Sequence, residues 1–175
     1  MEHGNSIKGK KNAIREGVKL ASGDIILCTD ADCEMGRRWI QTIVNYFELS
    51  SCKFVSAPVV LNQDDHLFYM YQQLELLSLV STSAAAIGLN KVTLCNGANL
   101  AFRREDYLEI NQKDFEKFRT DDLSLLHYFN DKFKNCIFFV KDKEAVVYTD
   151  KQNSIVSYFS QNVSTNWLHS LLVYQ

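Results

Sequence analysis

The first part of the chain alternates between stretches with helical spacing of apolar residues and short, uninterrupted apolar runs. Apolar residues recur at helical spacing over 11–21 and again over 36–49. Between these stretches, residues 25–29 form an apolar run of strand length. Such a run is typical of a strand buried on both faces in a parallel sheet. We therefore expect a helix, a buried parallel strand and a second helix.

The remaining pattern continues this alternation. Residues 53–61 predict a strand that Pro58 places at an edge or breaks, because proline has no amide hydrogen to donate. Residues 64–89 predict a long helix, and residues 93–102 predict two strands around an Asn96-Gly97 turn. The last expected elements are helices over 105–108 and 121–129, strands over 136–140 and 145–148, and an amphipathic helix over 154–175.

Helices and strands that alternate in this way predict an α/β sandwich with a mostly parallel sheet. No repeat or linker divides the 175 residues, so we expect a single domain over 1–175. The composition, 46% hydrophobic and 23% charged, excludes a disordered chain. The net charge of −2 argues against a nucleic-acid partner, because domains that bind nucleic acids are usually basic.

The five cysteines are odd in number and widely spaced, and no C-x-x-C is present. This favours reduced thiols in the cytoplasm over a disulfide framework or a zinc site. The first residues are polar and charged, so we expect no signal peptide. The longest uncharged stretch, 76–90, is shorter than a membrane span requires, so we expect no transmembrane helix.

Asp30-Ala31-Asp32 directly follows the first expected strand, where open α/β sheets place their ligands. Two carboxylates one residue apart can approach one hard cation, Mg²⁺ or Mn²⁺, which completes its coordination with water and phosphate oxygens. The alternative is a solvated turn with no ligand, and the placement after an apolar strand favours the metal interpretation.

Thr120-Asp121-Asp122 has two interpretations. Thr120 caps the following helix and the aspartates favour the positive end of its dipole, which is the interpretation that the residues alone favour. Alternatively, one aspartate is a general base, because adjacent carboxylates repel each other and can raise one pKa. A basic cluster near the start of the chain also has two interpretations, a phosphate contact or a solvated helix end; its members are Lys8, Lys10, Lys11 and Arg15.

Four blocks occur in the order of a known family. They read GKKNAIREGVKLASGDIILCTDAD, CNGANLAFRRE and TDDLSLL, followed by a helical stretch that contains Gln161 and Trp167. In these blocks the chain resembles family 2 inverting glycosyltransferases over about 9–167, and within that family the bacterial, membrane-associated, cellulose-synthase-like members. The resemblance implies a GT-A, Rossmann-like nucleotide-diphospho-sugar transferase fold.

The resemblance also implies roles for single residues. Asp30 and Asp32 would bind the diphosphate of the nucleotide-sugar, with Asp32 most directly on a Mg²⁺ or Mn²⁺ ion. Asp122 would be the catalytic base that deprotonates an acceptor hydroxyl as it attacks the anomeric carbon. Lys10 would approach the nucleotide, and the residues on the sugar and acceptor side would be Asn96, Gly97, Asp121, Gln161 and Trp167.

The sequence departs from the family in two places. The strand–helix–strand unit that precedes Gly9 in the family is missing, which is expected to leave a sheet edge open for a homo-oligomer. Gln161 and Trp167 are spaced more widely than the family's Q-x-x-R-W pattern, and the arginine is absent. The acceptor is expected to be a carbohydrate or a lipid-linked molecule, with the protein in the cytoplasm at the inner face of the membrane. The segment 154–175 would contact that membrane or pack in the core.

Two alternative functions compete with sugar transfer. The first is a non-catalytic module with the same fold, which binds nucleotide weakly or together with a partner chain. The second is a haloacid-dehalogenase-like phosphatase, which also places Asp-x-Asp after a buried strand but uses the first aspartate as a nucleophile. Cys33-Glu34 fits that phosphatase pattern poorly.

Overall fold

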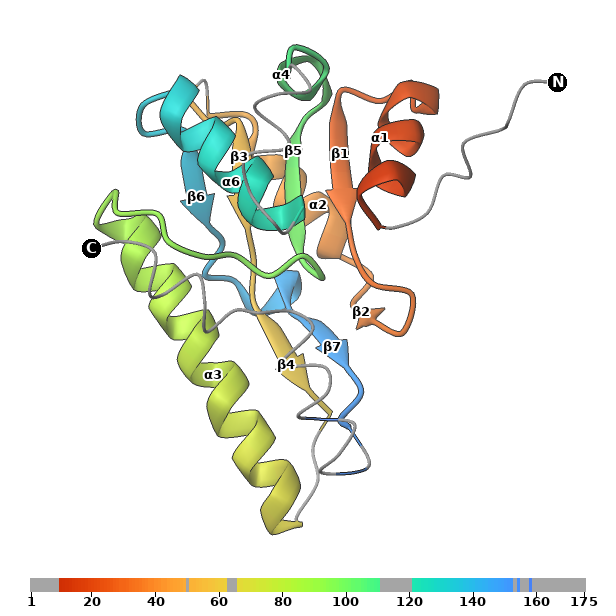
Figure 1. The fold of residues 1–175 in the computed structure, drawn as a ribbon, viewed down its shortest axis with the longest axis vertical. Coiled ribbons are helices and arrows are strands. Elements are labelled where there is room, and N and C mark those ends of the chain that lie inside the picture. Colours follow the sequence, from red (N-terminus) through yellow and green to blue (C-terminus); the bar gives the residue numbers. More distant parts are fainter. Residues whose placement is uncertain are drawn as a thin grey trace, which may run out of the picture.

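A computed structural model describes residues 10–49, 51–62, 66–110, 121–152, 154 and 158. The helices and strands follow the predicted order closely, and the expected helix at 154–175 lies outside the described residues apart from Ser154 and Tyr158. In chain order the elements are α1 (Lys10–Leu20), β1 (Ile25–Cys28), β2 (Glu34–Met35), α2 (Trp39–Tyr46), β3 (Phe54–Ser56), β4 (Val59–Leu61), α3 (Leu67–Gly88), β5 (Leu100–Arg103), α4 (Arg104–Leu108), α6 (Asp121–Lys132), β6 (Ile137–Phe139), the 3₁₀ helix η1 (Lys143–Ala145) and β7 (Val147–Thr149) (Figure 1).

The strands form two sheets, of order β1-β5-β3-β6 and β2-β7-β4. In the larger sheet, β5 runs antiparallel to both β1 and β3, and β6 runs parallel to β3. The α/β class is therefore confirmed, but the sheet is mixed, and the prediction of a mostly parallel sheet was wrong. β1 is also an edge strand, and its four residues are only partly buried rather than fully buried as predicted. An apolar run carries no information about the direction of the neighbouring strand or about its place in the sheet.

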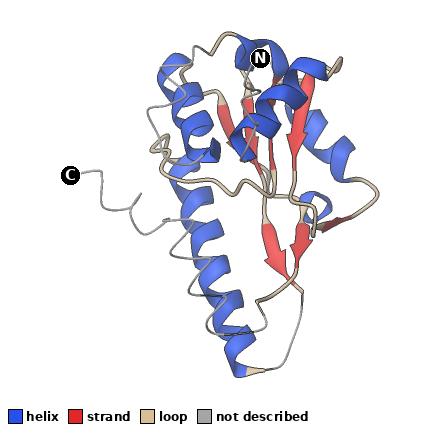
Figure 2. Cartoon of the chain, turned by 45° about the vertical axis from the view of Figure 1, so that its right-hand side comes forward, coloured by secondary structure: helices blue, strands red, loops and turns tan. Residues whose placement is uncertain are grey.

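Two hydrophobic cores flank the larger sheet, because successive strand side chains point to opposite faces. Phe54 and Phe102 face one core, which also takes buried side chains from α1, α3, α4 and α6. Val55 and Ala101 face the other core, which Trp39 and other side chains of α2 complete. Helices accordingly lie on both sides of this sheet, as in a three-layer sandwich (Figure 2).

Pro58 divides one expected strand into two, as its missing amide hydrogen predicts. The residues before it form β3 in the larger sheet, and those after it form β4 in the smaller sheet. The carbonyl of Pro58 accepts a hydrogen bond from the Val147 amide, 3.1 Å away, at the start of β7. One continuous stretch of backbone thus joins the two sheets.

The first strand of the expected pair within 93–102 is absent, and β5 begins only at Leu100. The Leu94 carbonyl accepts a hydrogen bond from the Ser83 hydroxyl of α3 at 2.7 Å, so a helix side chain takes the place of a strand partner. The prediction of two strands here was wrong for this reason. The short exposed strand β2, conversely, was not predicted.

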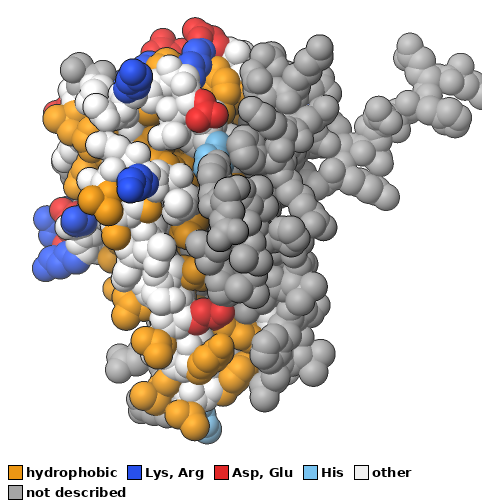
Figure 3. Space-filling model, turned by 60° about the vertical axis from the view of Figure 1, so that its left-hand side comes forward, with side chains coloured by type: hydrophobic (Ala, Val, Ile, Leu, Met, Phe, Trp, Pro, Cys, Tyr) orange, Lys and Arg blue, Asp and Glu red, His pale blue; other side chains and the backbone are white. Residues whose placement is uncertain are grey.

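Helix α3 is apolar around most of its circumference and contains a single charged residue, Glu75, among 22. Hydrophobic side chains gather on the molecular face to which it contributes (Figure 3). The exposed ones along its first three turns are Leu67, Met70, Tyr71, Leu74 and Leu77. Among the helices in the described ranges, none has both the length and the apolarity needed to cross a membrane.

Candidate active site

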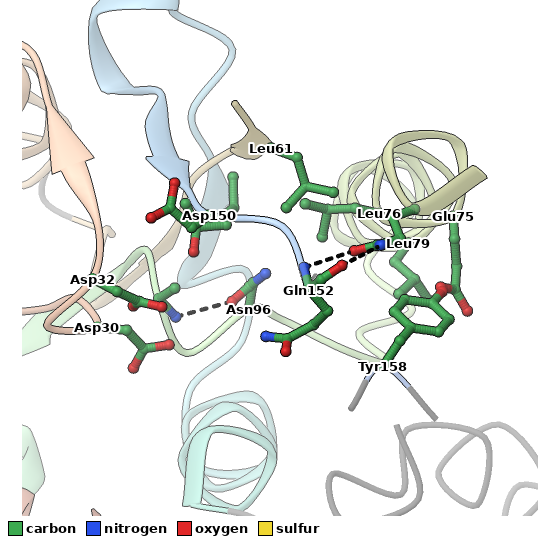
Figure 4. Close-up of a pocket in the computed structure, with 14 residues that line it drawn as sticks. Asp30, Asp32, Leu61, Glu75, Leu76, Leu79, Asn96, Asp150, Gln152 and Tyr158 are labelled. Carbon is green, nitrogen blue, oxygen red and sulfur yellow. Dashed lines mark hydrogen bonds between the residues drawn. The ribbon is translucent and has the colours of Figure 1, made fainter. Parts of the chain in front are cut away.

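A pocket of about 220 Å³ opens where the loop after β1, helix α3 and the segment after β7 meet. Asp30 and Asp32 lie on one side, and Glu75 projects from α3 on the opposite side (Figure 4). Asn96 and Gln152 lie between these two sides. The remaining lining residues mix apolar and polar side chains: Val59, Leu61, Gln72, Leu76, Leu79, Ala98, Thr149, Asp150 and Tyr158.

The Asp-x-Asp loop is a tight turn at the end of β1. The Cys33 amide donates a hydrogen bond to the Asp30 carbonyl at 3.2 Å, which closes the turn. Asp30 is partly buried and Asp32 is exposed, and both line the pocket. The two aspartates therefore lie in one cleft at the end of β1.

The strand β2 fixes this loop relative to the opposite end of the chain. Glu34 of β2 pairs with Tyr148 of β7 in antiparallel register. Figure 4 shows the carboxylates of Asp32 and Asp150 on the same side of the pocket. Asp150, whose carboxylate accepts a hydrogen bond from the Asn62 amide at 2.9 Å, was not predicted.

The donor set fits a hard divalent cation that is shared with a substrate. Among the described residues, no group of three or more His, Cys, Asp or Glu side chains is placed to hold a metal ion. Mg²⁺ and Mn²⁺ need fewer protein ligands, because they are held by one or two carboxylates together with water and phosphate oxygens. Asp30 and Asp32 provide such a pair.

The Asn96–Asn99 turn forms the floor between the two sides. The Asn96 side-chain oxygen accepts a hydrogen bond from the Ala98 amide at 2.9 Å, and the Asn99 amide donates to the Asn96 carbonyl at 3.1 Å. Asn96 lines the pocket, whereas Gly97 is buried and does not line it. The side chain of Asn96 is thus held by its own turn.

Asn99 anchors this turn in the core and was not predicted. Its side-chain amide donates to the carbonyls of Pro58 at 2.7 Å and Ala145 at 2.8 Å. Its side-chain oxygen accepts from the Trp39 indole at 3.1 Å. A polar residue flanked by apolar ones at the start of a strand was the available signal, and only the fold reveals the partners.

A reciprocal pair of hydrogen bonds ties α3 to the segment after β7. The buried Gln72 side chain donates to the Gln152 carbonyl at 3.0 Å and accepts from the Gln152 amide at 3.0 Å (Figure 4). Gln152 lines the pocket beside Asp150. We call this pair of bonds the glutamine clasp.

The other predicted site residues are placed as follows. Asp122 lies in the first turn of α6, and its carbonyl oxygen lies 3.6 Å from the sulfur of Cys95. Cys95 directly precedes the pocket residue Asn96 in the chain. Asp122 itself is not among the pocket residues, and its carboxylate accepts a hydrogen bond from the Leu123 amide at 3.1 Å. The side chains of Lys10 and Asp121, and all of Thr120, Gln161 and Trp167, lie outside the described part of the chain.

Comparison with known proteins gives a family match and a set of structural likenesses. The family model described as glycosyl transferase family 2 matches residues 3–110, which is more than half of the chain. Among curated proteins, none matches the chain by sequence.

The solved structures that match include glucosyl-3-phosphoglycerate synthase from Mycobacterium tuberculosis. Its complex with phosphoglyceric acid has 16% identity and a TM-score of 0.56, with 93% of this chain and 55% of that chain covered. Its complex with Mn²⁺, UDP-glucose and phosphoglyceric acid gives the same identity and TM-score, with 96% and 56% covered. A mycobacterial protein has 14% identity and a TM-score of 0.51, with 93% and 51% covered. These likenesses establish the GT-A fold, and the chain spans about half the length of these neighbours.

Proposed function

Because the chain belongs to glycosyl transferase family 2, we propose that it transfers a sugar from a nucleotide-diphospho-sugar to an acceptor hydroxyl. The observation that carries this proposal is the pocket at the end of β1, which Asp30 and Asp32 line together. A structural neighbour was solved with Mn²⁺ and UDP-glucose, which supports the same class of donor for this chain. The family match favours this proposal over the phosphatase interpretation.

In the proposed reaction, Asp30 and Asp32 would hold a Mg²⁺ or Mn²⁺ ion, with Asp32 most directly on it. When bound, such an ion neutralises the charge of a departing nucleoside diphosphate. Asp122 would accept the proton of the acceptor hydroxyl as that oxygen bonds to the anomeric carbon and the carbon–phosphate oxygen bond breaks. Attack from the face opposite the leaving group inverts the anomeric configuration. The contact of the Asp122 backbone with Cys95, the residue before Asn96, supports this role.

The remaining assignments complete the proposal. Lys10 would contact the nucleotide, and Asn96, Gly97, Asp121, Gln161 and Trp167 would serve the sugar and acceptor. The sequence blocks further favour a bacterial, cellulose-synthase-like subtype that acts in the cytoplasm at the inner face of the membrane. Fractionation of the natural host into membrane and soluble parts, followed by detection of the chain, tests that placement.

Calorimetric titration of the chain with UDP and with GDP, in the presence and absence of Mn²⁺, tests the donor proposal. We expect one nucleotide to bind only with Mn²⁺, and we expect Asp32→Asn to weaken that binding by at least about tenfold, because a carboxylate on the cation is lost. Asp131→Asn, an exposed aspartate of α6, is the matched control and is expected to bind as the wild type does.

Binding that does not depend on Mn²⁺, or that Asp32→Asn leaves unchanged, would contradict the proposed role of the Asp-x-Asp loop. Failure of both nucleotides to bind under every metal condition would instead favour the non-catalytic module. Asp122→Asn separates the base from the donor site, because it is expected to abolish transfer and to leave nucleotide affinity within about twofold.

A further inference from the structure

The charged residues that the structure describes in the pocket are all negative. Four of its lining residues are carboxylates: Asp30, Asp32, Glu75 and Asp150. Among the lining residues that the structure describes, none is a lysine, an arginine or a histidine. A divalent cation on the Asp-x-Asp loop would offset two of these negative charges, and the diphosphate of the donor would add to them. Once the donor is bound, none of the described lining residues therefore provides a positive charge to a second anion.

The walls that remain for an acceptor combine hydrogen-bonding and apolar groups. Glu75 and the leucines Leu76 and Leu79 come from α3, and Gln152 projects from the segment that the glutamine clasp holds (Figure 4). Carboxylates and amide oxygens accept hydrogen bonds from hydroxyl groups, and the charged acceptors form the stronger ones. Apolar side chains pack against the C–H faces of a sugar ring.

We propose, on the basis of the function proposed above, that the acceptor is an uncharged, hydroxyl-bearing saccharide and that acceptors with a phosphate or carboxylate group are rejected. A phosphate brought near Glu75 and Asp150 meets like charges inside a partly enclosed cleft, where repulsion is stronger than in open water. The mycobacterial synthase, in contrast, was solved with the anions phosphoglyceric acid and glycerol 3-phosphate. The two proteins thus share a fold and differ in acceptor class.

Glucose and glucose 6-phosphate are matched probes, because they differ only by the phosphate. The chain, saturated with Mn²⁺ and the nucleotide that it binds, is titrated with each sugar and followed by NMR. We expect glucose 6-phosphate to bind at least about tenfold more weakly than glucose. The double variant Glu75→Gln/Asp150→Asn is expected to reduce this difference by about tenfold. The control Glu48→Gln, an exposed glutamate after α2, is expected to leave it unchanged.

Equal or tighter binding of glucose 6-phosphate, failure of glucose to bind at all, or an unchanged difference in the double variant would each overturn the inference. The exposed Asp150 is also replaced alone, so that the comparison survives if the double variant does not fold. Nucleotide binding is measured in the same samples. Intact nucleotide binding with a preference for the phosphorylated sugar rejects the acceptor class alone, whereas loss of nucleotide binding from the wild-type chain rejects the donor proposal.

Discussion

Asn99 shows how one buried side chain can fix a pocket that it does not line. Its amide group makes three hydrogen bonds, to groups in the backbone before β4, in η1 and in α2. Two of the three partners, Trp39 and Ala145, belong to the buried core beneath α2. The turn that carries Asn96 into the pocket is therefore held from within the core.

Replacing Asn99 by alanine is expected to lower the free energy of unfolding by about 2 to 4 kcal/mol, because the Trp39 indole and two carbonyls lose their partner in a buried place. Urea unfolding followed by tryptophan fluorescence measures the change. Asn45→Ala, at an exposed position of α2, is the control and should change stability by less than about 0.5 kcal/mol. Equal effects at both positions would show that the hydrogen bonds of Asn99 contribute little.

At the scale of elements, α3 is joined to the rest of the pocket by packing and by the glutamine clasp. It packs against β4 and β6, while Gln72 bonds both backbone groups of Gln152. The segment after β7 has no strand partner at Gln152 among the described residues, so these two bonds take the place of a ladder.

Gln72→Leu is expected to increase hydrogen exchange of the Gln152 amide by at least about tenfold, because that amide loses its acceptor. Gln72→Glu keeps the acceptor and loses the donor, so the same amide should keep most of its protection. Two-dimensional NMR of the exchanging protein resolves the difference, and Gln41→Leu at an exposed position of α2 is the control. Unchanged exchange in Gln72→Leu would mean that the clasp does not hold the segment.

The elements that could be predicted from sequence are those that a local pattern determines. Apolar spacing located the helices. Pro58 located the break between β3 and β4, because a proline has no amide hydrogen to donate to any neighbouring strand. Strand direction and the short strand β2 depend on which segments meet in space. The irregular path over 91–96 could not be predicted either, because it depends on how this segment folds back onto α3, where the Ser83 hydroxyl donates to the Leu94 carbonyl.

The same distinction applies to the candidate site, because only some of its residues belong to a local sequence pattern. Asp30 and Asp32 adjoin each other in the chain and follow an apolar run, so sequence alone placed them in a cleft, and Asn96 belongs to a recognisable turn. Glu75, Asp150 and Gln152 reach the pocket from elements that meet only in the folded protein. Their polar character in the sequence does not distinguish them from other surface residues.

At the scale of the whole molecule, the two cores enclose cysteines on both sides of the larger sheet. Cys52 lies in the core beneath α2, and Cys136 lies in the core beneath α6. Burial raises the pKa of the Cys52 thiol to about 12 and that of Cys136 to about 11, because a thiolate in either place would lose its hydration. Cys33, in contrast, is partly exposed beside Asp32.

Reaction with iodoacetamide at pH 9 is expected to modify Cys33 in the folded protein at least about a hundredfold faster than Cys52 or Cys136. In denaturing urea the three thiols should react at similar rates, because both cores are then open to water. Mass spectrometry of peptides from timed samples measures each rate. Rapid modification of Cys52 without urea would show that the core beneath α2 opens independently of global unfolding.

The small sheet has a mechanical consequence for the pocket. Because β2, β7 and β4 are hydrogen-bonded into one sheet, we expect the Asp-x-Asp loop and the Asp150 edge to move together. The Asn96 turn is anchored beside the same sheet through Asn99. The wall formed by α3 is joined to this sheet by side-chain packing and by the glutamine clasp rather than by a ladder. We therefore expect the pocket to widen for a bulkier sugar by an outward tilt of α3, which would break the bonds between Gln72 and Gln152.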